Sequence, residues 1–152
     1  MKAEIVRLEL ADFEKCGSIW DMQKQSALAE QFYKEMQEGI RTTYIYKIDG
    51  AFIGEISVVT DTDDPAYTVS RQRLYVSRLI VKSDHRRQGI GKRLVEFISE
   101  KAKEEGYTEL SIGVDLDNYP ALKLYHAAGF VNLLFVGEDQ WGKYVKLMKQ
   151  LF

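Results

Sequence analysis

The chain has 152 residues, of which 45% are hydrophobic and 29% are charged, and its formal net charge is −2. This length and composition are typical of a globular protein with its own core, so we expect a single domain over residues 1–152. The slightly acidic balance argues against nucleic acid as a partner. The one cysteine, Cys16, excludes a disulfide within the chain, and its place in a helical pattern predicts a small buried hydrophobe rather than a reactive thiol.

The sequence carries no targeting or membrane signal. No apolar run approaches the roughly 18 residues of a membrane span, and the N-terminal residues lack the apolar core of a signal peptide. We therefore expect a cytoplasmic protein with no membrane partner. The two histidines, His85 and His126, have no partner at metal-ligand spacing, so we expect no metal site.

The first half of the chain predicts three strands and two helices. The strands are short runs rich in β-branched and aromatic residues: 5–8, 43–48 and 52–59. The helices begin at the capping residues Asp12 and Ser26 and run to about residues 23 and 38. Gly39 suits the end of the second helix, and Asp49 with Gly50 predicts a tight hairpin turn.

The second half predicts alternating strands and helices after a polar loop at residues 60–66. The predicted strands are 73–81, 109–115, 130–136 and 143–148. One helix covers residues 88–105 and is closed by Gly106, and another is capped by Asn118, has Pro120 in its first turn and ends at Gly129. Strands that first form hairpins and then alternate with helices predict a mixed α/β class with a mostly antiparallel sheet.

A glycine loop at residues 86–91, Arg-Arg-Gln-Gly-Ile-Gly, joins a predicted strand to an amphipathic helix. Glycines let a ligand approach the backbone closely, and the helix start offers unpaired amides and a positive dipole end. The stretch also carries one acid, Asp84, against five cations: Lys82, Arg86, Arg87, Lys92 and Arg93. Cations are unfavourable at a helix start unless an anion is bound, so the loop predicts a phosphate or pyrophosphate site.

Two common phosphate loops do not fit this sequence. The dinucleotide fingerprint needs a third glycine where Leu94 stands, and a Walker-type loop is absent. The remaining pattern, Arg86-x-x-Gly89-x-Gly91, resembles the acetyl-CoA loop of the GCN5-related N-acetyltransferase (GNAT) family.

A second motif carries the same resemblance independently. Asn118-x-x-Ala121, followed by Leu124-Tyr125-x-x-x-Gly129-Phe130, is similar to the second GNAT signature. The resemblance implies the GNAT fold, in which a mostly antiparallel central sheet is splayed open, is flanked by helices and holds the cofactor in the opening. It also implies direct transfer of an acetyl group from acetyl-CoA to a primary amine. The acceptor would be a small amine, an aminoglycoside-like drug, an amino acid or a peptide N-terminus.

The resemblance also implies which residues contact acetyl-CoA. The pantetheine arm would pair with the main chain of the strand before the loop, at Leu79, Ile80 and Val81. The pyrophosphate would lie on the loop, at Arg86, Arg87, Gln88, Gly89, Ile90, Gly91 and Lys92. Asn118 would contact the cofactor, and Tyr125, a phenol protonated at pH 7, would serve as general acid toward the departing thiolate. Without the resemblance, Asn118 is a plain N-cap and Tyr125 an amphipathic residue at a helix edge.

The general base is not assigned by the resemblance. Some relatives carry a glutamate five residues before the asparagine, where this chain has Gly113. Glu55 is the first substitute, acting through a water, although a strand carboxylate is more often merely solvated. Weaker candidates are Tyr75, Asp115 and Glu30. Four aromatic residues are candidates for the acceptor side, with core packing the favoured alternative for each: Trp20, Tyr33, Trp141 and Tyr144.

Two other functions remain open. A non-catalytic acyl-CoA-binding sensor on the same fold is favoured by Gly113 and disfavoured by Tyr125. A protein that binds the phosphates of another nucleotide is the weaker alternative. Homodimers are common in the GNAT family, so a homodimer is also open.

Overall fold

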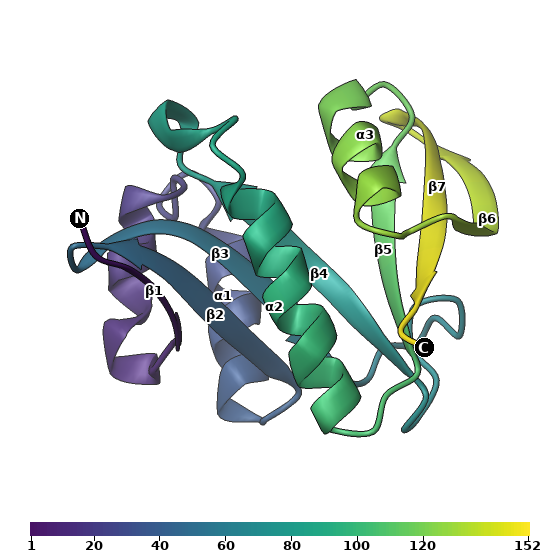
Figure 1. The fold of residues 1–152 in the computed structure, drawn as a ribbon, viewed down its shortest axis with the longest axis horizontal. Coiled ribbons are helices and arrows are strands. Elements are labelled where there is room, and N and C mark those ends of the chain that lie inside the picture. The colour runs from purple at the N-terminus through teal and green to yellow at the C-terminus, as the bar shows by residue number, and fades with distance from the viewer. The chain divides into compact units, whose positions relative to one another are not determined.

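The computed structural model describes residues 1–152 and contains a seven-stranded sheet of order β1-β2-β3-β4-β5-β7-β6, with helices on it (Figure 1). The strands are β1 (Ala3–Arg7), β2 (Arg41–Ile48), β3 (Ala51–Val59), β4 (Arg73–Val81), β5 (Glu109–Asp115), β6 (Asn132–Asp139) and β7 (Gly142–Gln150). The helices are η1 (Leu10–Ser18), α1 (Ser26–Gln37), η2 (Ser83–His85), α2 (Ile90–Glu104) and α3 (Tyr119–Ala127). Strands β4 and β5 pair in parallel, whereas β1/β2, β5/β7 and β6/β7 are antiparallel. The predicted mixed α/β class is confirmed.

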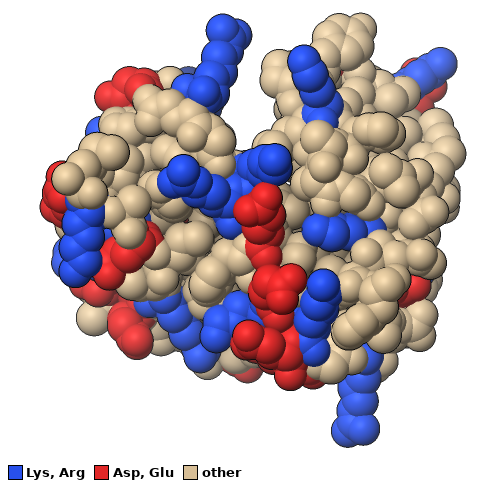
Figure 2. Space-filling model, viewed as in Figure 1, with Lys and Arg blue, Asp and Glu red and all other residues tan.

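The residues group into two compact units. The first comprises Met1–Val58 and Arg78–Leu94, and the second comprises Val59–Ser77 and Val95–Phe152. Strand β4 and helix α2 therefore contribute residues to both. None of the helices combines the length and hydrophobicity that a membrane span requires. Basic and acidic side chains are mixed over the face shown in Figure 2, in keeping with the small net charge.

Strand β3 is the centre of the first unit, and every residue after Ala51 is buried. A Cβ at Gly54 would lie within 3.5 Å of side-chain atoms of Ile90 and Leu94 in α2. The next residue, Glu55, contacts Trp20 instead. Because successive strand residues point to opposite faces, both faces of β3 are covered. The hydrophobic cluster on this unit consists of Leu8, Cys16, Ile19, Trp20, Phe32, Ile45 and Phe52.

The helix predicted to run from Asp12 to residue 23 is wrong. The chain forms the 3₁₀ helix η1 instead, which starts at Leu10 and has no side-chain cap. Gly17 and Ser18 are poor helix formers, and the Ser18 hydroxyl donates to carbonyls of Lys15 and Phe52 at 3.1 and 3.0 Å. Such side-chain to backbone bonds compete with continuation of an α-helix.

Cys16 is buried as predicted, with 1% of its surface exposed. Burial, and secondly the charge of Glu55, raise the pKa of the Cys16 thiol. A thiol held in its neutral form is a poor nucleophile. The prediction of a small buried hydrophobe is therefore confirmed.

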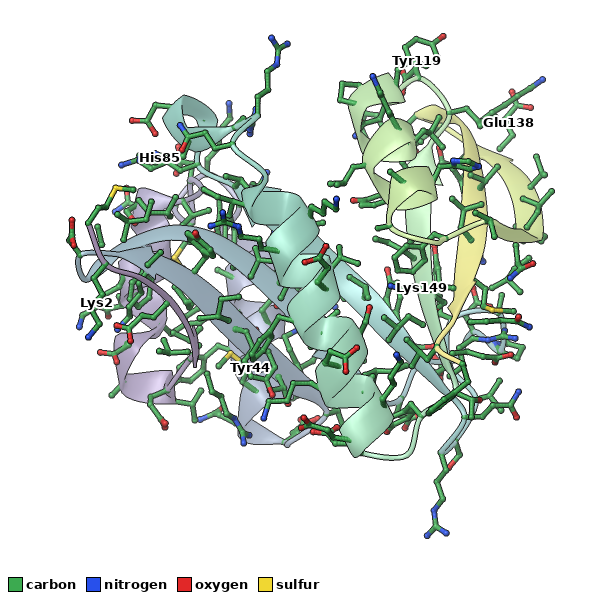
Figure 3. All side chains as sticks on the ribbon, in the orientation of Figure 1. Lys2, Tyr44, His85, Tyr119, Glu138 and Lys149 are labelled. Carbon is green, nitrogen blue, oxygen red and sulfur yellow. The ribbon has the colours of Figure 1, made fainter.

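The second unit packs β5, β6, β7 and the start of β4 with α3 and the end of α2. Leu110, Ile112 and Val114 alternate along the buried face of β5. Lys149 of β7 donates to the Ser99 hydroxyl of α2 at 2.9 Å, and Figure 3 shows Lys149 in this region. Helix α3 is capped as predicted, since the Asn118 side chain accepts the N–H of Ala121 at 3.2 Å.

Candidate functional site

The glycine loop precedes α2 in the first unit. Arg87 and Gly89 have left-handed backbones, with φ of +65° and +79°, so the helix begins at Ile90 rather than at the predicted residue 88. The N–H of Arg93 donates to the C=O of Gly89 at 3.1 Å, and the amides of residues 90–92 therefore precede the hydrogen-bonded helix. A Cβ at Gly89 would meet nothing within 4 Å. This open turn at the positive end of a helix fits a pyrophosphate.

The four cations of the loop divide into two pairs. Arg86 donates from Nε to the C=O of Val81 at 3.1 Å, and Arg93 donates from Nη1 to the Tyr46 hydroxyl at 2.8 Å. These two arginines hold the loop against β4 and β2. All four cations are exposed, and the other two, Arg87 and Lys92, make no such hydrogen bond. An incoming phosphate could pair with these two cations without breaking an existing hydrogen bond.

The acid of this stretch is already engaged. Asp84 Oδ1 lies 2.7 Å from His85 Nδ1, and this hydrogen bond, helped by the charges of His85 and Lys82 and opposed by desolvation, lowers the pKa of Asp84. Figure 3 shows His85 on the segment ahead of α2. The only acid of this stretch is therefore hydrogen-bonded to His85, and the net charge of the loop stays positive.

The strand residues predicted for the pantetheine arm are half-buried: Leu79, Ile80 and Val81. Strand β3 approaches them closely, because a Cβ at Gly54 would lie 3.3 Å from the carbonyl oxygen of Ile80. The parallel pairing of β4 with β5 runs from Arg73 to Val76, and the three residues follow that paired segment along β4. Their contact with a pantetheine arm stays a prediction.

A pocket of about 450 Å³ lies within the second unit. Its lining residues come from the loop before β4 and from β4, β5, α3, β6 and β7: Tyr67, Tyr75, Gly113, Val114, Asp115, Asn118, Tyr125, Asp139, Tyr144 and Lys146. Its volume is in the range of small-molecule sites. The structure thus brings together Asn118 and Tyr125, which the sequence places on one side of a helix, and it adds three further tyrosines.

Tyr125 is a buried residue of this pocket. It is 8% exposed, and its ring packs edge-on against Phe130 with centroids 6.0 Å apart. Burial, and secondly the neighbouring Tyr75, raise the pKa of the Tyr125 phenol. The hydroxyl is therefore protonated at neutral pH, as a general acid requires.

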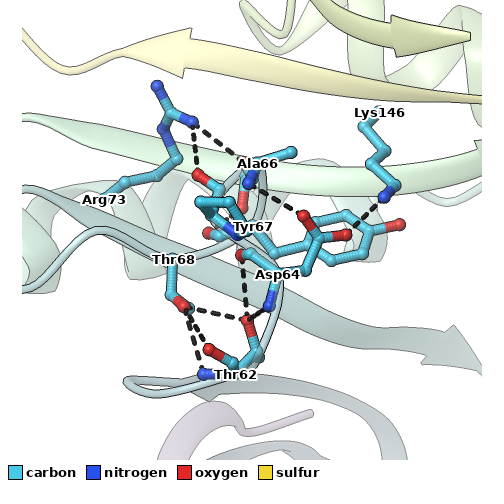
Figure 4. Close-up of polar contacts among 9 residues, drawn as sticks. Thr62, Asp64, Ala66, Tyr67, Thr68, Arg73 and Lys146 are labelled. Carbon is cyan, nitrogen blue, oxygen red and sulfur yellow. Dashed lines mark hydrogen bonds and ion pairs between the residues drawn. The ribbon is translucent and has the colours of Figure 1, made fainter.

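Carboxylates outnumber free cations in the pocket. Lys146 is paired with Asp64, which lies on the loop before β4 (Figure 4). Asp139 accepts the N–H of Trp141 at 2.8 Å, and Asp115 is exposed. With Lys146 neutralised by its partner, the remaining charges of the lining are negative and favour a cationic ligand.

The sequence model of the acetyltransferase (GNAT) family matches residues 3–130. The chain belongs to the GNAT family. The match confirms the membership that the motifs at residues 86–91 and 118–130 indicate, and it extends over most of the chain.

Several curated N-acetyltransferases are similar to part of this GNAT chain. The N-acetyltransferase 8 proteins of Rattus norvegicus and Homo sapiens are 32% and 40% identical over 87 and 68 residues, which are 57% and 45% of this chain. N-alpha-acetyltransferase 30 of Saccharomyces cerevisiae is 37% identical over 70 residues, 46% of this chain. The chain spans between 29% and 39% of the length of these three relatives.

Solved GNAT structures share the fold over the full chain. An N-acetyltransferase from Staphylococcus aureus Mu50 has a TM-score of 0.77 and 17% identity, with all of both chains covered. The PaiA N-acetyltransferase of Thermoplasma acidophilum, in complex with coenzyme A, has a TM-score of 0.70 and 17% identity, with 99% of each chain covered. The fold class implied by the sequence motifs is therefore confirmed.

Glu55 lies in the first unit and is more buried than a solvated strand carboxylate. It is 3% exposed and accepts the indole N–H of Trp20 at 2.7 Å. Burial raises the pKa of Glu55, while Arg78, the Trp20 hydrogen bond and Arg41 oppose that rise. A base of raised pKa suits proton abstraction near neutral pH, but the role of Glu55 as base stays a prediction.

Most of the other candidates for the general base and for the acceptor side are divided between two pockets. Tyr75, Asp115 and Tyr144 line the pocket of the second unit, whereas Glu30 and Tyr33 line a separate pocket in the first unit. Core packing is confirmed for Trp20, which is 6% exposed, and wrong for Trp141, which is 78% exposed on the β6–β7 turn.

Sequence reasoning missed Tyr67 and Lys146, which contribute to the same pocket as Tyr125. Lys146 is the direct cross-strand partner of Gly113 in the β5–β7 pairing. The signal that could have found them is Gly113 itself, because a strand residue without a side chain leaves room for its neighbours.

Proposed function

We propose that this GNAT protein transfers an acetyl group from acetyl-CoA to a primary amine by direct attack. The observation that carries the proposal is the turn at Arg87 and Gly89, which opens onto the first amides of α2. Acetyl-CoA is the co-substrate that supplies the acetyl thioester. The chain would hold its pyrophosphate with the amides of residues 88–92 and with the exposed cations Arg87 and Lys92.

Tyr125 is proposed as the general acid. Its burial raises the pKa of the phenol, so that a proton stays on Oη at neutral pH. A thiolate leaving group needs such a proton or a strong hydrogen bond. Asn118 lines the same pocket and is proposed to contact the co-substrate, with its own position fixed by the cap that it forms on α3.

The acceptor is proposed to be a cationic primary amine, either a small molecule or a peptide N-terminus. Asp115 and Asp139 give the pocket a negative balance, and tyrosine rings offer faces that attract an ammonium group. The name of the yeast relative, N-alpha-acetyltransferase 30, supports a peptide N-terminus as one acceptor class.

A cytoplasmic location, a single domain and activity without a metal belong to the same proposal, and they rest on the sequence. Homodimer formation stays open.

The test is a screen of primary amines in which release of free thiol from acetyl-CoA is followed over time. The panel contains ethylamine, cadaverine, phenethylamine, an aminoglycoside and peptides with free N-termini. We expect thiol release that requires both acetyl-CoA and one class of amine. If acetyl-CoA raises the melting temperature but no amine releases thiol, the transferase proposal fails and the non-catalytic acyl-CoA sensor replaces it.

A further inference from the structure

The side chain of Tyr67 occupies the space beside Gly113. A Cβ at position 113 would lie 2.2 Å from the Tyr67 hydroxyl oxygen and 3.2 Å from its Cζ. No side chain larger than hydrogen therefore fits at position 113 while Tyr67 stays in place. The phenol fills the space that a side chain at position 113 would otherwise take.

Tyr67 is positioned by a loop that is tightly bonded although it contains no helix or strand. The Ser111 hydroxyl of β5 donates to the Tyr67 carbonyl, and the Tyr67 amide donates to the Asp64 carbonyl at 3.0 Å. Arg73 donates from Nη1 to the carbonyl of Ala66 at 3.0 Å. These contacts, shown in part in Figure 4, fix the backbone on both sides of Tyr67.

A second set of contacts fixes the ring itself. The Tyr67 ring stacks on Tyr75 with centroids 4.1 Å apart and planes 20° apart. The ammonium group of Lys146 lies 4.7 Å from the centroid of the Tyr67 ring. Lys146 also pairs with Asp64, so one lysine holds both the loop and the ring.

The phenol of Tyr67 is not suited to act as the general base. Burial, followed by the nearby tyrosines and Asp64, raises the pKa of Tyr67 well above its usual value. A hydroxyl that stays protonated can shape a pocket and donate a hydrogen bond, but it cannot accept a proton from an ammonium group at neutral pH.

We propose that Tyr67 is a specificity-determining residue of the acceptor pocket, where its ring fills the space beside Gly113 and restricts the pocket to slender primary amines. The inference rests on the proposed function for the reaction, but it concerns which amines enter. A pocket wall built on a glycine and a braced ring sets size limits more sharply than a mobile side chain does.

Four variants test this inference. Tyr67→Ala removes the ring, Gly113→Ala introduces the methyl group that meets the Tyr67 hydroxyl, Tyr67→Phe removes only that hydroxyl, and the fourth variant combines Tyr67→Phe with Gly113→Ala. Tyr107→Ala is the matched control, since Tyr107 is half-buried in the same unit and is not part of the pocket. Ethylamine and phenethylamine serve as slender and bulky acceptors.

Tyr67→Ala should raise the preference for phenethylamine over ethylamine, measured as the ratio of kcat/KM values, by about tenfold or more. Gly113→Ala should lower kcat/KM for ethylamine by about 10- to 100-fold through displacement of Tyr67. The double variant should recover most of that loss, because the nearest remaining ring atom is 3.2 Å away. An unchanged preference in Tyr67→Ala, or a double variant no better than Gly113→Ala, overturns the inference.

Amine binding in the presence of coenzyme A, measured by calorimetry, separates this inference from the proposed function. If the wild type binds ethylamine without releasing thiol, and Tyr67→Ala shifts binding toward phenethylamine, the transferase proposal fails while the role of Tyr67 stands. If neither amine binds the wild type or Tyr67→Ala, the pocket is not an amine site and the inference is overturned.

Discussion

The indole N–H of Trp20 donates to Oε1 of Glu55 at 2.7 Å, and this pair is buried. The guanidinium of Arg78 lies over the Trp20 ring, 4.4 Å from its centroid. Glu55 thus has a hydrogen-bond donor and a nearby positive charge, and burial still raises the pKa of its carboxyl group. Desolvation outweighs the attraction of the surrounding cations, so the charged form of Glu55 is disfavoured in the folded protein.

The first prediction is that Glu55→Gln removes part of the pH dependence of stability. Because the folded-state pKa of Glu55 is raised, this carboxyl group makes its full contribution to stability below its unfolded pKa, near 4.3. The contribution is lost as the pH rises through the folded-state pKa. The free energy of unfolding of the wild type should therefore fall over this window, and less so in Glu55→Gln. Urea unfolding from pH 4 to 8 measures it. Glu30→Gln, at an exposed position on α1, is the control and should keep the wild-type slope.

The second prediction concerns the rate of the same Glu55→Gln variant. If Glu55 takes the proton of the amine, kcat/KM should fall by about 10²-fold or more, the low end of general-base contributions. The loss should be largest between the pKa of Glu55 and that of the amine, where the carboxylate is ionised and the amine still carries its proton, and it should shrink at lower pH. A pH–rate profile that coincides with that of the wild type would assign the proton to water or to another residue.

Much of the fold is readable from local patterns. The bounds of β4 and β5 agree with the predicted strands 73–81 and 109–115, because both are apolar runs between clear turn residues. The type of η1 was not readable, since an α-helix and a 3₁₀ helix share a similar apolar spacing. What decided it was the bond from the Ser18 hydroxyl to the Phe52 carbonyl, which depends on tertiary structure.

In the candidate site, too, local features could be predicted from the sequence and tertiary contacts could not. The glycine loop and the Asn118 cap are local features, and the sequence places both. The burial of Glu55 could not be predicted from alternation, because β3 is covered on both faces and has no polar side. The contact of Tyr67 with Gly113 joins residues far apart in the chain, and a polar loop sequence contains no sign of such packing.

The third prediction distinguishes the binding role of Gly89 from the loss of stability that follows when any glycine with a left-handed backbone is replaced. Gly89 and Gly39 both have φ of +79°, and a Cβ at either meets nothing within 4 Å. Gly89→Val and Gly39→Val should therefore each lose about 1–2 kcal/mol of unfolding free energy. Only Gly89→Val should also lose the stabilisation by acetyl-CoA, which is about 2.7 kcal/mol at 100 times Kd for a ligand of the native state.

Thermal unfolding with and without acetyl-CoA measures this difference. A Gly89→Val protein that folds and is stabilised as much as the wild type would remove the loop from the co-substrate site.

The fourth prediction is that Asp64→Asn loosens the loop at residues 60–72. The hydrogen bond from Lys146 is the main cause of the lowered pKa of Asp64, so the pair stabilises the loop above the unfolded pKa, near 3.9, and is lost as the pH falls through the folded value. Asp64→Asn should therefore show faster hydrogen exchange in this loop at pH 7. Asp63→Asn, an exposed neighbour, is the control. Equal exchange in the two variants would mean that the backbone bonds alone hold the loop.

The fifth prediction is that Tyr125→Phe lowers kcat by about 10²-fold or more, the low end of general-acid contributions. The substitution removes one hydroxyl and keeps the ring, so the edge-on contact with Phe130 should survive. The loss should appear equally in kcat and kcat/KM, as expected for an interaction made only in the transition state. Stabilisation by acetyl-CoA should change little.

Tyr119→Phe is the matched control for this experiment, because Tyr119 lies on the same helix and is 73% exposed. The control should keep wild-type rates, which shows that loss of a phenol on α3 is not harmful in itself. The rates are measured with the acceptor amine that the screen identifies. An acetyl donor with a better leaving thiolate offers a further check, since acetyl thioesters of more acidic thiols need less help from an acid and should narrow the gap between Tyr125→Phe and the wild type. Wild-type rates in Tyr125→Phe with acetyl-CoA would make the phenol a structural group and transfer the acid role to solvent.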